Sequence, residues 1–76
     1  MMKKTISPTE AFTTLTPREK EVFSYLITGM KEKDIVSEIG INLNTLKFHI
    51  KNIYKKLQVR SRSELILHSI EVLKNL

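Results

Sequence analysis

The sequence predicts an all-α domain of four helices over residues 15–76. Three observations predict it: apolar residues recur at helical spacing, two segments carry the start signal of a helix, and two isolated glycines stand where helices should end. Its 76 residues are enough for one domain. Residues 1–14 show no sustained period and are predicted to form a flexible tail, in which a short helical turn after Pro8 and docking of Ile6 and Phe12 stay open.

The first helix begins at a capping box. Thr16 can accept from the amide of Glu19, Glu19 can reach back to Thr16, and Pro17 suits the first helical position. Gly29 is predicted to end this helix in the left-handed conformation, with Met30 folding back over the helix end. The apolar residues that form its buried face are Val22, Phe23, Leu26 and Ile27.

A shorter second helix is predicted over residues 32–39. Its start is poorly capped, because Lys31 is no capping residue and a cation is unfavourable there. A tight turn at Gly40 follows, and Asn42 is a good cap for a third helix that ends near Leu57. Two helices joined by about three residues that include a glycine form a helix-turn-helix, whose second helix enters the major groove of DNA. The inward residues of the second helix are Ile35, Val36 and Ile39.

The third helix, residues 42–57, indicates a polyanionic partner. No Asp or Glu occurs between Glu38 and Glu64, whereas six of the 13 Lys and Arg residues lie from Lys47 to Arg62. The net charge of +5 favours nucleic acid or an anionic membrane surface, with simple solubility as the plain alternative. Opposite the basic side, one stripe at i, i+4, i+7 and i+11 is apolar: Leu46, Ile50, Ile53 and Leu57.

The last helix begins at a second capping box, Ser61 and Glu64, and runs for about a dozen residues. Arg62 is expected to pair with Glu19 or Glu21. The helix has two neighbouring apolar stripes, one of Ile66, Ile70 and Leu73 and one of Leu65, Val72 and Leu76. They form either one broad core face or a core face beside a dimer interface. We predict the interface, because so small an all-helical domain rarely needs both stripes inside. Its predicted residues are Leu65, His68, Ser69 and Val72.

The chain lacks the residues that several classes of function require. The chain has no cysteine, and Asp34 is its one aspartate beside the histidines His49 and His68, of which His49 is expected to pack in a structural role. We therefore expect no enzyme, no catalytic residue, no metal, no cofactor and no small-molecule ligand. No apolar run approaches a signal sequence or a membrane span. We expect a cytoplasmic protein without a membrane partner, which lies on the nucleoid when it binds DNA.

An ordered set of residues between Leu15 and Ile70 carries a family resemblance: LTPREKEVF, then a glycine at position 29, then KDIVSEIGINLNTLKFHIKNIYKKLQVRSRSEL. Together they resemble the LuxR/GerE-type helix-turn-helix domain of bacterial transcription regulators. The resemblance implies a DNA-binding domain that dimerises through its last helix and binds inverted half-sites. Since a short tail precedes the match, we expect a stand-alone, single-domain member similar to GerE. The departures from the family pattern are Lys31, Val36, Phe48 and Gln58.

Three residues are predicted to contact DNA bases. Lys47, Phe48 and Lys51 lie on the exposed side of the third helix, in the half from which side chains reach base edges. Lysine can donate to guanine and an aromatic ring can contact the thymine methyl group, and the resemblance implies base readers at these positions. Phosphate contact or solvation stays open for the two lysines, and a contact with the tail for Phe48. The predicted phosphate contacts, with solvation as their alternative, are Lys31, Lys33, Asn44, Thr45, Lys55 and Lys56.

The favoured function is a homodimeric, sequence-specific transcription regulator of double-stranded DNA, with RNA polymerase as a further candidate partner. A second hypothesis is a factor like region 4 of a sigma factor, which would bind RNA polymerase as a monomer. A third is an interaction module that heterodimerises with a larger LuxR-type regulator and modulates it. The basic side of the third helix favours the first hypothesis over the third.

Overall fold

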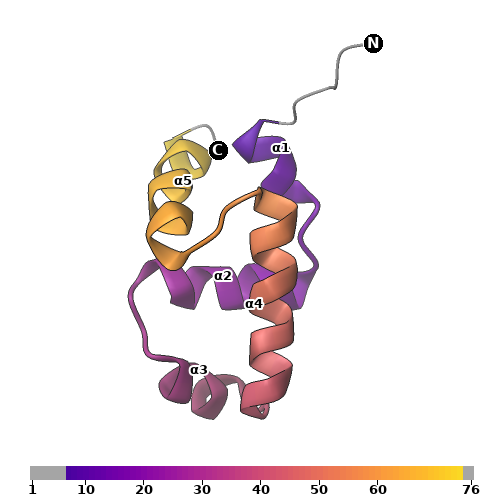
Figure 1. The fold of residues 1–76 in the computed structure, drawn as a ribbon, viewed down its shortest axis with the longest axis vertical. Helices are drawn as coiled ribbons and strands as arrows, with labels where there is room; N and C mark the ends of the chain where they lie inside the picture. Colours follow the sequence, from indigo (N-terminus) through magenta and orange to yellow (C-terminus); the bar gives the residue numbers. More distant parts are fainter. Residues whose placement is uncertain (1–6, 75–76) are drawn as a thin grey trace.

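The computed structural model describes residues 7–74, and Figure 1 shows them as an all-helical arrangement. Expectations about Ile6 and Leu76 lie outside this range. Within it, no strand is present, and none of the helices combines the length and apolarity needed to cross a bilayer. The helices are α1 (Pro8–Thr13), α2 (Pro17–Ile27), α3 (Glu32–Ile39), α4 (Leu43–Leu57) and α5 (Arg62–Lys74). The four predicted helices are confirmed as α2 to α5, and α1 is additional.

Helix α1 corrects the prediction of a flexible tail over residues 8–13. It begins at a capping box of its own, in which the Ser7 hydroxyl accepts from the Glu10 amide at 3.2 Å and Glu10 accepts from the Ser7 amide at 3.1 Å. Ala11 is buried, and the Phe12 ring meets Phe23 edge-on with centroids 5.1 Å apart. The option of a turn after Pro8 with a docked Phe12 is thus the one that the structure adopts.

Helix α2 has the ends that its sequence predicts. The Thr16 hydroxyl accepts from the Glu19 amide at 3.1 Å, while the Glu19 carboxylate accepts from the Thr16 amide at 2.9 Å. Gly29 has a φ of 83°, in the left-handed region that favours glycine. The amide of Met30 donates back to the Tyr25 carbonyl at 3.3 Å, which closes the end of the helix.

Helices α3 and α4 form the predicted helix-turn-helix. The side chain of Lys31 makes no cap, whereas the Asn42 side chain accepts from the Thr45 amide at 2.8 Å. Gly40, at a φ of 80°, turns the chain between them. At the far end of α4 the chain turns through Gln58, which has a φ of 58° although it is not a glycine. In Figure 1, α3 lies beside the first turns of α4, while α1 and α5 lie near its other end.

The core joins all five helices. Helix α4 packs against α1, α2 and α3, and α5 packs against α1 and α2. The predicted α4 stripe is confirmed, since Leu46, Ile50, Ile53 and Leu57 are all buried. The predicted pairing of Arg62 with Glu19 or Glu21 is wrong. Its guanidinium instead donates to the Met30 carbonyl at 2.7 Å. The remaining buried apolar residues are Ala11, Leu15, Val22, Phe23, Leu26, Ile35, Val59, Leu65 and Val72.

Candidate nucleic-acid interface

The solvent-facing side of α4 carries the three residues predicted to contact bases. Lys47, Phe48 and Lys51 are all exposed, because the stripe that anchors α4 lies on the other side of the helix. Phe48 is 61% exposed, and its ring lies beside that of His49 with centroids 6.1 Å apart. The alternative for Phe48 was a contact with the N-terminal tail. Within the described part of that segment, the aromatic ring that packs on the domain is Phe12, which contacts Phe23 of α2. The fold leaves Phe48 available to a partner, and base contact stays a prediction.

The predicted phosphate residues surround this face. Lys31 and Lys33 are exposed at the start of α3, and Lys55 is exposed near the end of α4. At the start of α4, Asn44 is exposed and Thr45 is half-buried. Free amides at a helix start attract anions, and the adjacent Asn42 side chain caps one of them here. The arrangement places cations on both helices of the helix-turn-helix.

Lys56, a predicted phosphate contact, forms an ion pair within the fold. Its ammonium lies 2.7 Å from the Glu19 carboxylate and 3.4 Å from the carbonyl oxygen of Thr14. Glu19 is 4% exposed, so this ion pair fastens the end of α4 to the start of α2. Lys56 lies about 80° around the helix from Phe48, to one side of the reading face. We therefore assign it to the fold and not to the phosphate contacts.

The Glu19 carboxylate is held in its charged form. Burial alone would raise its pKa, but hydrogen bonds from the Lys56 ammonium and the Thr16 amide outweigh burial, and the charges of Lys56 and His49 add to them. The pKa of Glu19 is consequently lowered. This places His49 near the ion pair, on the half-buried flank of α4.

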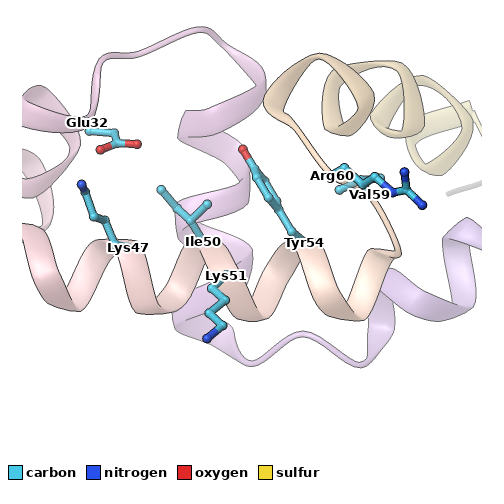
Figure 2. Close-up of a pocket in the computed structure, with 7 residues that line it drawn as sticks. All are labelled: Glu32, Lys47, Ile50, Lys51, Tyr54, Val59 and Arg60. Atoms are coloured by element: carbon cyan, nitrogen blue, oxygen red, sulfur yellow. The ribbon is translucent and has the colours of Figure 1, made fainter.

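A groove of about 540 Å³ runs along the other flank of α4. Figure 2 shows that Lys47, Ile50 and Tyr54 extend from α4 toward the side on which Glu32 lies, at the start of α3. Lys51 points to the opposite side of α4. Burial raises the pKa of Tyr54; the nearby Arg62 opposes this rise and the charge of Glu32 adds to it. The lining residues are Glu32, Lys47, Ile50, Lys51, Tyr54, Val59 and Arg60.

The structure adds two residues that the sequence analysis missed. Arg60 is exposed on the turn between α4 and α5 and lines the groove that Lys47 also lines. Leu43 is 44% exposed at the first position of α4, one turn before Lys47 and on the same side. The signal for Arg60 was present in the uninterrupted basic run, but its place beside the helix depends on the turn at Gln58.

Three of the four residues predicted for a dimer interface on α5 are buried inside the domain. Leu65 and Val72 are 0% exposed and Ser69 is 4% exposed, because α1 and α2 cover this side of α5. His68 is half-buried beside them, and its buried Nδ1 has no hydrogen-bond partner among the described residues. The stripe that faces solvent, which we call the outer stripe of α5, consists of Leu67 (68% exposed), Ile70 (61%) and Leu73 (55%).

A scaffold helix, a glycine turn and a capped basic helix define a helix-turn-helix DNA-binding domain. Residues 13–69 match the model of the family described as bacterial regulatory proteins, luxR family. The chain belongs to this family and is a LuxR-family DNA-binding domain of a transcription regulator. That family is defined by regulation and not by an enzymatic reaction.

Individual relatives agree with the family match. The chain is 43% identical over 53 residues to the nitrate/nitrite response regulator protein NarP of Escherichia coli (strain K12), covering 70% of this chain and 25% of NarP. It is 36% identical over 61 residues to the probable transcriptional regulatory protein SgaR of Hyphomicrobium methylovorum, covering 80% and 29%.

Among solved structures, the response regulator StyR matches with a TM-score of 0.80 at 38% identity, over 84% of this chain and 32% of StyR. The chain thus spans a quarter to a third of the length of these relatives.

Proposed function

We propose that the chain binds DNA sequence-specifically as a homodimer, with α4 in the major groove of each of two inverted half-sites. The observation that carries this proposal is the exposed side of α4, where Lys47, Phe48 and Lys51 lie together on a helix that contains no acidic residue. A basic helix that is anchored on one side and exposed on the other matches the shape and charge of a major groove.

Each part of the interface has a separate task. Lys47 and Lys51 donate to guanine acceptors, and the Phe48 ring packs on a thymine methyl group. Phosphates are held by cations and polar groups on both sides of the reading helix, which set its register without reading sequence. The residues assigned to phosphates are Lys31, Lys33, Asn44, Thr45 and Lys55.

The outer stripe of α5 supports the dimer. Leu67, Ile70 and Leu73 place three large apolar side chains in solvent along one helix, and a second copy of the same stripe would cover them. A two-fold dimer presents two reading helices to half-sites about one helical turn, roughly 34 Å, apart. Inverted half-sites follow from that symmetry.

Selection of bound sites from random DNA tests the proposal, with the stoichiometry of the complex measured alongside. Lys51→Ala should relax the base preference and cost about 1–3 kcal/mol at the preferred site. Lys55→Ala should weaken all sequences alike and lower the slope of log K against log salt by about 0.9. Binding that neither substitution alters would remove α4 as the reader, and a footprint that requires a larger LuxR-type partner would replace the homodimer by a heterodimer.

A further inference from the structure

The groove beside α4 contains an acid in a surface otherwise suited to DNA. Among the described residues that line it, Glu32 carries the negative charge, whereas Lys47, Lys51 and Arg60 are cationic. Figure 2 shows the Glu32 and Lys47 side chains on facing sides of the groove, one from α3 and the other from α4. Glu32 is half-buried, so its carboxylate is less screened by water than one on an open surface.

The charge of the Glu32 carboxylate affects which DNA group can enter the groove. Lys47, which points into the groove, would alone attract the sugar–phosphate backbone of any sequence, since phosphate contacts carry no sequence information. A fixed carboxylate repels phosphate, and like charges placed together suppress wrong partners at a binding surface. Burial raises the pKa of Tyr54 on the facing helix, and the charge of Glu32 adds to this rise from across the groove.

We propose that Glu32 is a specificity-determining residue whose carboxylate excludes the DNA backbone from the groove and leaves Lys47 free to contact a base edge. This rests on the proposed function of α4 as the DNA reader. On DNA bound in the wrong register, Lys47 would otherwise neutralise a phosphate as readily as it reads a base. Glu32 thereby weakens non-specific binding more than specific binding.

The simplest alternative is that Glu32 merely favours the start of α3 through the helix dipole. Asp34 separates the two roles, since it is the other acidic residue in the first turn of α3 but does not line the groove. Glu32→Gln and Asp34→Asn remove the same charge from the same helix turn. Glu32→Asp keeps the charge, and it should keep the wild-type preference.

The experiment compares the affinity for a random-sequence duplex with that for the selected site, for each variant at several salt concentrations. Glu32→Gln should tighten binding to the random duplex about threefold to tenfold and change binding to the selected site much less, so that the specificity ratio falls by about the same factor. Asp34→Asn should leave that ratio unchanged. Circular dichroism melts of the variants check that α3 stays folded.

Two results would overturn the assignment of Glu32: an equal response to Glu32→Gln and Asp34→Asn, or no response to either. A different result bears on the proposed function, namely a wild-type chain that binds no duplex at any salt concentration. Wild-type binding with a clear site preference that is insensitive to Glu32 would therefore reject the role of Glu32 and leave α4 as the reader.

Discussion

Helices α4 and α5 each bury one apolar stripe, but they differ in what they leave outside. The exposed side of α4 is basic and polar except for Leu43 and Phe48, whereas α5 exposes Leu67, Ile70 and Leu73. On α4 the pattern of charge alone separates the inner side from the outer one. On α5 both stripes are apolar, so that only the neighbouring helices decide which one is buried.

The largest expected effect contrasts the two stripes of α5. Leu65→Ala should lower the free energy of unfolding by about 2–5 kcal/mol, because it leaves a cavity at a residue that is 0% exposed. Leu67→Ala should change it by less than about 0.5 kcal/mol in the monomer. Urea titration at a protein concentration that keeps the chain monomeric measures both. Equal costs would mean that the burial of α5 differs from the one described.

The outer stripe should instead control association. Ile70→Glu places a charge on the stripe that we assign to the dimer, and affinity for paired half-sites should fall about 100-fold, or about 2.7 kcal/mol. Affinity for a single half-site should stay unchanged. Analytical ultracentrifugation and titration of paired and single half-sites measure this. Ser24→Glu, at an exposed position of α2, introduces the same charge away from the stripe and serves as the control. A variant that still dimerises would place the interface elsewhere.

These two helices also show what a sequence can predict. For α4 the cap at Asn42, the end near Leu57 and the buried stripe were all correct, because capping groups and one clear apolar stripe are local signals. For α5 the start at the capping box was correct, but the predicted interface lies on the buried stripe and not on the exposed one. The cause lies in α1, whose six residues are too few to show a helical period although they cover the inner side of α5. The groove likewise could not be predicted from the sequence, because only the turns of the fold bring α3 and Arg60 to the same side of α4.

The two helices also differ in how they are fastened, and pH should separate them. The pKa of Glu19 is lowered in the fold, so its ion pair with Lys56 stabilises above the ordinary glutamate pKa of about 4.3, and this stability is lost as pH falls through the lowered pKa. Glu19→Gln should cost about 1–2 kcal/mol at neutral pH, since Lys56 is partly exposed, and progressively less as the solution becomes acidic. Urea titrations across the acid range measure this.

Two controls make that pH comparison specific to α4. Glu21→Gln removes an exposed pair with Arg18 and should cost less than about 0.5 kcal/mol at any pH. Leu65→Ala should cost the same at neutral and acid pH, because the buried contacts that it removes are apolar and do not titrate. A cost of Glu19→Gln that stayed constant with pH would show that the ion pair does not hold α4.

The smallest expected effect lies at the turn that joins the two helices. Gln58 has a φ of 58° and ψ of 44°, a left-handed conformation that costs a residue other than glycine about 1 kcal/mol. Its side chain is exposed, while the amide of the buried Val59 donates to the Tyr54 carbonyl at 2.9 Å and closes the turn. The backbone therefore defines this turn, and Gln58→Gly should raise the free energy of unfolding by about 0.5 kcal/mol once its gain in unfolded-state entropy is subtracted.

Gln58→Val provides the opposite control, because a branched side chain is disfavoured in that region and should lower stability by about 1 kcal/mol or more. Thermal melts of both variants give the sign, and the DNA specificity ratio should be the same in both. A glycine variant that melts earlier would mean that the Gln58 side chain itself helps to join α4 to α5. The orientation of Arg60 beside the groove would then depend on that side chain, and the DNA specificity ratio would change with it.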